Sequence, residues 1–350
     1  MRSRNLPGNL MYGVVDRFFT GEWSTNALAD WLTTQGYNTS REEIYPIIRK
    51  AIKHGFVKLC PARADGMLSQ LAKAFPQMPA DTRIVDVEGS LVGSNLAIET
   101  ADLVLGLIIQ VYEKKMQKKR RGAASSRVHV GFGGGDTARH VAEKLALRLK
   151  MEPELPPLTF HALSSGFDAR QPLTAPVAFF SYFSGLNHSI DFVGLFCAPV
   201  VAWEGYDEIK KLPVVRDSFK EAENIDIVVT SLAQADDEHG LLNMFLTMHK
   251  GRQAGLERAG HIGDVQWQPY SREEPLTVNT GIRAVTLFDL PDLVKLVDTE
   301  GKHVVLVAGP CSGCGRTKAP ALHPLLTKPL LRMCNHLVTE VTTVREMLRN

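Results

Sequence analysis

Residues 304–318 read VVLVAGPCSGCGRTK, an apolar strand that runs into a glycine-rich loop and ends at Lys318. A strand followed by such a loop can present backbone N–H groups and a lysine to an anion. Residues 128–137, VHVGFGGGDT, repeat the arrangement and are followed by helical apolar spacing from Ala138 to Lys150. The two loops together predict one pocket for a phosphorylated small molecule.

The fold class follows from further segments of the same kind. Apolar runs that favour strands alternate with helical patterns, among them a long helix predicted over 96–116. The predicted strands are 83–87, 128–130, 158–163, 225–230 and 304–307. This alternation predicts an α/β protein with a mostly parallel sheet. Ligands of such sheets bind beyond the carboxyl ends of the strands, where both glycine-rich loops fall.

Charge and cysteine content set broad limits. The 350 residues include 40 Lys+Arg against 38 Asp+Glu, so the formal net charge of +2 gives no whole-protein argument for nucleic-acid binding. We find no signal peptide and no apolar run long enough to cross a bilayer. The cysteine count is 5, an odd number, which favours free thiols in a reducing interior. These features predict a cytoplasmic protein with no membrane partner.

The first 60 residues have a different organisation. Helices are predicted over 9–19 and 25–33, and a third helix begins after the capping box Ser40-Arg41-Glu42-Glu43. His54-Gly55 ends this third helix, and residues 56–59, FVKL, predict a short strand. Helix, helix, turn, helix and wing is the order of a winged helix-turn-helix domain.

In such a domain the third helix enters the major groove of DNA. Its polar face carries the predicted DNA contacts Arg41, Arg49, Lys50 and Lys53. Glu42 and Glu43 suit the helix dipole but repel a phosphate backbone. The alternative readings are a charged face that is only solvated and a module for oligomerisation or protein contact.

Several segments, taken in order, carry a resemblance to a known family. They are 130–137 (VGFGGGDT), 164–166 (SSG), 225–232 (IDIVVTSL), 262–265 (IGDV), 281–285 (GIRAV), 307–309 (VAG) with Lys318, and 336–340 (HLVTE). In this order and at roughly this spacing, the chain resembles the SorC/DeoR-type sugar-responsive transcriptional regulators of bacteria. The resemblance covers nearly the whole chain.

The resemblance implies a repressor or activator that binds operator DNA as a homo-oligomer, dimer or tetramer, and needs no cofactor. It implies a winged helix-turn-helix domain over 1–60, a linker helix over 61–82, and an effector-binding and oligomerisation domain of the NagB/RpiA/CoA-transferase-like type over 83–350. The effector is expected to be a sugar or sugar phosphate. Its predicted contacts are Gly133, Gly134, Gly135, Asp136, Thr137, Ser165, Gly166, Asp264 and Lys318.

The chain also departs from the family pattern. The turn over 131–137 is longer and includes Asp136, whose carboxylate would repel a phosphate unless it binds hydroxyl groups. The closing loop over 310–318 is longer too, which can seat Lys318 differently. The turn over 34–39 is long for a helix-turn-helix.

An enzyme is the main alternative to a regulator. Sugar-phosphate isomerases, deaminases and CoA-transferases share this type of sheet, but they need a positioned base or nucleophile. The candidate carboxylates Asp136, Asp264 and Glu340 do not form a convincing acid and base pair in the sequence.

A metal site is the other alternative. Cys311-x2-Cys314, with Cys334 and His336 downstream, has the ligand types of a zinc site. The second half lacks the usual spacing, so the sequence favours unpaired thiols and no metal.

Overall fold

The computed structural model describes residues 6–21, 23–57, 60–119, 126–152, 154–166, 171–186, 189–248, 253–277, 279 and 281–349. The chain divides into two compact units, Met1–Cys60 and Pro61–Asn350. Each unit has its own hydrophobic core.

The first unit contains three helices near the predicted positions, α1 (Gly8–Thr20), α2 (Thr25–Thr34) and α3 (Arg41–Lys53). Their apolar faces meet in one small core. The core residues are Met11, Val14, Val15, Leu28, Ala29, Leu32, Ile44, Ile48 and Ala51. The predicted capping box starts α3, because the Glu43 carboxylate accepts a hydrogen bond of 2.8 Å from the Ser40 backbone N–H. Local sequence therefore fixes where α3 begins.

The predicted wing differs from the structure in its first half. Phe56 and Val57 form a bend and not a strand, while Lys58 and Leu59 lie outside the described residues. The bend has a local cause: Gly55 ends α3 with a φ of 79°, and the Phe56 N–H donates back to the Ala51 carbonyl. These bonds continue the helix end and give no strand pairing.

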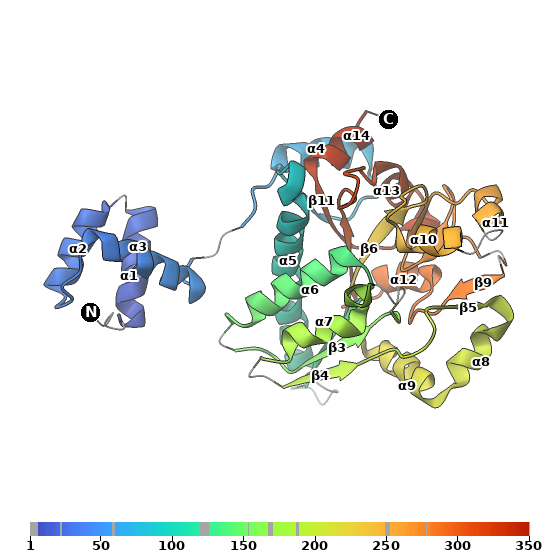
Figure 1. The fold of residues 1–350 in the computed structure, drawn as a ribbon, viewed down its shortest axis with the longest axis horizontal. Helices are drawn as coiled ribbons and strands as arrows, with labels where there is room; N and C mark the ends of the chain where they lie inside the picture. Colours follow the sequence, from blue (N-terminus) through green and yellow to red (C-terminus); the bar gives the residue numbers. More distant parts are fainter. Residues whose placement is uncertain are drawn as a thin grey trace. The chain divides into compact units, whose positions relative to one another are not determined.

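The second unit is built on a sheet of seven parallel strands with a short hairpin attached (Figure 1). The parallel strands stand in the order β1 (Asp81–Val85), β11 (His336–Glu340), β10 (His303–Ala308), β6 (Ile227–Gln234), β2 (Val128–Phe132), β3 (Leu158–Ala162) and β4 (Ile190–Val193). The hairpin of β7 (Gly263–Val265) and β8 (Gln268–Tyr270) pairs antiparallel with the end of β6. The predicted α/β class with a mostly parallel sheet is confirmed.

Helices cover both faces of this sheet, since alternate strand residues point to opposite sides. Val229 and Val305 face one core, with the helices α5 (Val92–Lys119), α6 (Asp136–Leu149) and α7 (Pro176–Phe183). Val228 and Val304 face the other. That core contains α4 (Asp65–Ala74), α9 (Pro213–Glu221), α12 (Leu290–Val297), α13 (Ala319–Leu325) and α14 (Val341–Met347). The result is a three-layer α/β/α unit.

The remaining elements are short. They are η1 (Gly89–Leu91), η2 (Pro172–Thr174), β5 (Val200–Ala202), η3 (Trp203–Gly205), α8 (Tyr206–Lys211), η4 (Ala222–Asn224), α10 (Leu241–Met248), α11 (Gln253–Arg258), β9 (Ile282–Ala284) and η5 (Pro329–Leu331). β5 and β9 form a separate antiparallel pair.

One expectation about apolar runs was wrong. Residues 92–118 of α5 form a helix that is long and apolar enough to cross a membrane by length and composition. Ala101, Val104 and Ile108 of this helix are fully buried within the unit. The helix is apolar because it packs against one face of the sheet and against α6, as Figure 1 shows.

The segment over 61–82, expected as a linker helix, lies inside the second unit. Leu71 of α4 and the following Phe75 are buried in the core shared with α12, α13 and α14. The Ala64 N–H donates to the Ile84 carbonyl at 2.9 Å, so the chain before α4 runs along β1. Tertiary packing of its apolar side chains therefore helps to hold α4 in place.

Candidate functional site

A cavity of about 110 Å³ opens where β2, β6 and β10 end, beside the β7–β8 hairpin. Six of the nine predicted effector contacts line it: Gly134, Gly135, Asp136, Thr137, Asp264 and Lys318. The other lining residues are Ser231, Leu232, Ala233, Asp237, His239, Gly240, Leu241, Gln266, Trp267, Pro310, Cys311 and Ser312. Both glycine-rich loops therefore meet in one place, at the carboxyl ends of β2 and β10, the two parallel strands that flank β6.

The first loop is shaped by two glycines. A Cβ at Gly134 would lie 2.9 Å from the Trp267 ring, and Gly135 has a φ of 106°. The Gly133 N–H donates to the Val229 carbonyl and the Gly135 N–H to the Thr174 carbonyl, both at 2.9 Å. These two donors hold the loop, so they do not serve a ligand. The first turn of α6 instead leaves the N–H groups of Asp136 and Thr137 without helical partners.

The negative charge of Asp136 is compensated by a neighbouring cation. Its Oδ1 accepts hydrogen bonds from the Arg139 guanidinium at 2.6 and 2.9 Å, one helical turn further along α6. This ion pair offsets the repulsion that Asp136 would exert on an anion at the helix N-terminus.

Lys318 reaches the cavity from the position that precedes α13. Its side chain is 9% exposed and its Nζ donates to the Leu232 carbonyl at 2.7 Å. Burial lowers the pKa of Lys318, and the negative charges of Asp237, Cys311 and Asp264 oppose that shift. A buried ammonium with one hydrogen bond keeps two donors for a ligand.

Asp264 lines the same cavity from β7. It is 5% exposed, and its Oδ1 accepts a hydrogen bond of 3.2 Å from the Trp267 N–H. Burial raises the pKa of Asp264 to about 7, although the Trp267 N–H and the charge of Lys318 act to lower it. The carboxyl group therefore changes charge near neutral pH.

This shift predicts that Asp264 makes stability depend on pH. The ordinary pKa of an aspartate is 3.8, so the folded state holds a proton that the unfolded chain has released between pH 3.8 and about 7. The stabilisation is complete at low pH and is lost as the pH rises through about 7. Relative to Asp264→Asn, the wild-type unfolding free energy should fall by about 2 kcal/mol between about pH 5.5 and 7.5, measured by urea unfolding. Parallel curves for the two proteins would contradict the assignment.

The turn between β7 and β8 supplies two residues that the sequence did not indicate. Gln266 and Trp267 have φ values of 53° and 62°, although neither is glycine or asparagine. Such backbone conformations cost on the order of 1–3 kcal/mol each. The Gln266 side chain is buried at the cavity, and neither its amide oxygen nor its amide nitrogen has a hydrogen-bond partner. A strained turn that holds an unsatisfied amide at a cavity is typical of a ligand contact.

Three predicted contacts lie away from the cavity lining. Gly133 contributes backbone packing, since a Cβ there would lie 2.9 Å from the Thr230 hydroxyl oxygen. Ser165 and Gly166 follow β3, which is separated from β6 by β2. The neighbouring positions 167–170 lie outside the described residues.

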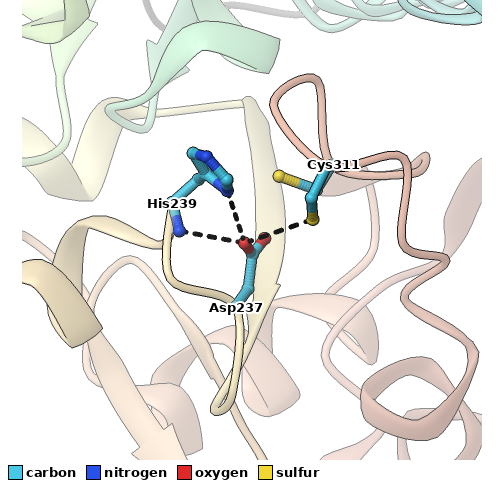
Figure 2. Close-up of side chains that lie close together, drawn as sticks. Asp237, His239 and Cys311 are labelled. Atoms are coloured by element: carbon cyan, nitrogen blue, oxygen red, sulfur yellow. Dashed lines mark hydrogen bonds and ion pairs between the residues drawn. The ribbon is translucent and has the colours of Figure 1, made fainter.

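The four residues that the sequence suggested as zinc ligands, Cys311, Cys314, Cys334 and His336, do not lie together in the structure. Cys334 is buried in the core and His336 Nδ1 lies 2.8 Å from Asp81 Oδ2, so neither lies with Cys311 and Cys314. The structure instead brings Asp237 and His239, from the loop after β6, to the two cysteines of the loop after β10. Figure 2 shows Asp237, His239 and Cys311 pointing toward one another.

Glu340 was one of the carboxylates considered as a catalytic residue of an enzyme. In the structure it stabilises the start of α14. It is fully buried and caps α14 by accepting from the Thr342 N–H at 2.5 Å and the Thr343 N–H at 2.7 Å. Three hydrogen bonds, the third from the Thr343 hydroxyl, occupy its oxygens. It is therefore not available as a general base.

The second candidate surface is the outer face of α3. Arg41, Tyr45 and Arg49 are exposed and follow one another at a spacing of four residues, which places them along one ridge. Lys50 is half-buried, and the side chain of Lys53 lies outside the described residues. The exposed Tyr45 was not predicted as a contact.

Known structures were compared with the chain as a whole. No family model matches it, and no curated protein is significantly similar to it in sequence. The full-length sorbitol operon regulator SorC from Klebsiella pneumoniae has a TM-score of 0.64 at 13% identity, over 99% of this chain and 100% of that one. A transcriptional regulator from Streptococcus pneumoniae has a TM-score of 0.61 at 12% identity, over 81% of this chain and 97% of that one.

A DeoR family transcriptional regulator from Listeria monocytogenes has a TM-score of 0.58 at 14% identity, over 81% of this chain and 98% of that one. The regulators from Streptococcus pneumoniae and Listeria monocytogenes match about four fifths of this chain with nearly all of their own length. The match to SorC covers nearly the whole of both chains. The structural neighbours of this chain are thus SorC- and DeoR-family transcriptional regulators, and its fold is theirs.

Proposed function

We propose that the protein is a transcriptional regulator that binds operator DNA through the first unit and responds to a small effector in the cavity. The observation that carries this proposal is the similarity to full-length SorC over 99% of the chain, which extends through the helical unit as well as the sheet unit. Under this proposal the protein acts in the bacterial cytoplasm as a homo-oligomer whose symmetry is matched by a pseudo-palindromic operator.

The cavity supports an effector that carries both hydroxyl groups and a negative charge. Lys318 and the N-terminus of α6 favour an anion, while the Asp264 carboxyl and the Gln266 amide can bind hydroxyl groups. A sugar phosphate combines these features. A neutral sugar or polyol would bind to Asp264 and Gln266, and water would then occupy the places beside Lys318 and the N-terminus of α6.

Selection of genomic fragments tests the DNA-binding half of the proposal. The purified full-length protein is incubated with fragmented bacterial DNA at near-physiological salt, where non-specific phosphate binding is weak. Enrichment of a pseudo-palindromic site is the expected result. The effector half is tested by thermal shift with sugars, polyols and sugar phosphates, followed by operator titration with each hit. Enrichment of no site would overturn the proposal.

Gln266→Leu provides a specific prediction for the effector cavity. Leucine removes a buried amide that has no partner, so the unfolding free energy should rise by about 1 kcal/mol in denaturant titration. The same change should weaken effector binding, since the amide is expected to bind hydroxyl groups of the ligand. Gln234→Leu is the matched control because its buried amide oxygen also lacks a partner but it does not line the cavity. An unstable Gln266→Leu protein with normal effector affinity would contradict the assignment.

One observation keeps an enzyme as the second candidate. Asp264 and Lys318 both have pKa values displaced toward neutrality by burial, and both line the same cavity, which is common in active sites. The matching chemistry is proton transfer in a sugar-phosphate isomerisation. Incubation with hexose and pentose phosphates, followed by NMR, would detect turnover. If the protein binds an operator and turns over none of these sugar phosphates, the enzyme is excluded and the regulator remains as the proposed function.

A further inference from the structure

Four side chains with metal-binding atoms converge beside the cavity. Asp237 and His239 come from the loop after β6, and Cys311 and Cys314 come from the loop after β10. One ligand atom from each residue lies within 4.8 Å of all the others. Figure 2 shows how Asp237, His239 and Cys311 face one another from the two loops. Because parallel β6 and β10 are neighbours, their ends bring these distant segments together.

We propose that Asp237, His239, Cys311 and Cys314 form a zinc-binding site that ties the two loops together. Two thiolates, one imidazole and one carboxylate form a tetrahedral ligand set that suits Zn²⁺ better than an oxygen-preferring cation. With Zn–S bonds of about 2.3 Å, the two sulfurs of a tetrahedral site stand about 3.8 Å apart. The spread of up to 4.8 Å between the ligand atoms is thus close to coordination geometry.

The Cys311 loop has the internal bonds of a metal-binding turn. The Gly315 N–H donates to the Cys311 carbonyl at 2.9 Å, and the Cys311 N–H donates to the Arg316 carbonyl at 2.8 Å. Burial raises the pKa of the Cys311 thiol, and the backbone N–H groups of Cys314 and Gly313 act to lower it. Donors of this kind stabilise a thiolate in the second shell of a metal.

The two loops also fit each other in shape. A Cβ at Gly313 would lie 2.6 Å from the His239 ring, so the absence of a side chain at this position lets the imidazole approach the cysteines. On the other loop, Asp237 Oδ1 accepts a hydrogen bond of 3.0 Å from the His239 N–H. His239 Nδ1 lies 3.5 Å from the same oxygen. The ligands are thus held near one point before a metal arrives.

Burial and charge support a cation at this point. Asp237 and Cys311 are buried, whereas His239 and Cys314 are exposed, so the cluster has a fixed inner half and an accessible outer half. Two thiolates and a carboxylate exceed the charge of Zn²⁺ by one negative charge. The ammonium of Lys318, on which Asp237, Cys311 and Cys314 all act electrostatically, offsets it.

The site lies at the wall of the cavity, because Asp237, His239 and Cys311 are among the lining residues. Zinc would therefore fix the relative position of two loops that form that wall. The inference does not depend on the proposed function, since metal binding can be measured without DNA or an effector.

Cobalt substitution of the full-length protein tests the site directly. The protein is reduced, stripped with a chelator and titrated with Co²⁺ under anaerobic conditions. We expect one equivalent to bind, with sulfur-to-metal charge-transfer absorption and tetrahedral ligand-field bands. Zn²⁺ should displace the cobalt, and competition with a chromophoric chelator then gives its affinity. Weak absorption typical of oxygen ligands would overturn the proposal, as would no stoichiometric binding.

Variants of the exposed ligands separate the site from adventitious binding. Cys314→Ser should weaken Zn²⁺ binding by about 100-fold or more and reduce the charge-transfer intensity by about half, since one of two thiolates is lost. His239→Ala should weaken binding but keep the charge-transfer band. Cys60→Ser is the matched control, an exposed cysteine of the other unit. Circular dichroism establishes that each variant is folded, and a folded Cys314→Ser protein with wild-type affinity would refute the site.

Discussion

Lys318→Met should lower the affinity for an anionic effector by about 100-fold or more, while operator binding without effector stays unchanged. Truncating one partner of a buried, hydrogen-bonded charge pair costs about 2–5 kcal/mol, because the other charge is left in the cavity without its partner. Lys318 is 9% exposed, so water cannot replace it. Methionine keeps an unbranched apolar chain of similar length and removes only the charge and the donors.

Isothermal titration with the effector found by thermal shift measures this change. Lys328→Met is the matched control, because Lys328 is more exposed, pairs with Glu273 and does not line the cavity. The control should bind effector normally. A neutral effector gives a smaller loss, so comparison of a sugar with its phosphate separates the charge of Lys318 from its hydrogen bonds. If Lys318→Met lowered the affinities for the sugar and for its phosphate by the same small factor, the phosphate group would not bind at Lys318.

The two glycine-rich loops could be predicted because their signals are local. Gly134, Gly135 and Thr137 follow a short apolar run, and Lys318 follows another, so their places at strand ends were readable from the sequence. That both loops reach one cavity followed from the rule for parallel sheets. The order of the strands could not be read in this way. Ser165 and Gly166 were expected at the site from the family resemblance, and they follow β3, which lies beyond β2 and outside the cavity lining.

Gln266 and the Asp237–His239 pair were missed for different physical reasons. The turn at Gln266 and Trp267 has φ values that normally require glycine or asparagine, so its sequence carries no hairpin signal. Asp237 and His239 follow a strand that continues to Gln234, four residues past its predicted end. Their approach to Cys311 depends on the pairing of β6 with β10, a tertiary contact that no local pattern encodes.

In the N-terminal unit, too, some features could be predicted from the sequence and others could not. Helix boundaries and the capping box were predictable because they depend on neighbouring residues, and they were confirmed within one or two residues. The missing strand at Phe56 and Val57 shows the limit. Two β-favouring residues do not form a strand when the glycine before them continues the helix end.

Arg41→Glu combined with Arg49→Glu should abolish operator binding at physiological salt. Both side chains are exposed on the outer ridge of α3. A dimer would lose about four phosphate contacts, and at about 0.15 M salt this alone weakens binding about 1,000-fold, before any repulsion from the new carboxylates. Since phosphate contacts carry no sequence information, operator and random DNA should weaken together.

The salt dependence distinguishes this mechanism from unfolding or a change of oligomer. For the neutral variant Arg41→Gln with Arg49→Gln, the slope of log K against log salt should be shallower than in the wild type by about 3.6. Lys211→Glu with Lys220→Glu changes the net charge as much as the glutamate variant does but lies in the second unit, on exposed positions of α8 and α9. If that control lost operator affinity as strongly, long-range charge and not α3 would hold the DNA. If the α3 variants bound normally, the helix would be the protein-contact module that Glu42 and Glu43 also permit.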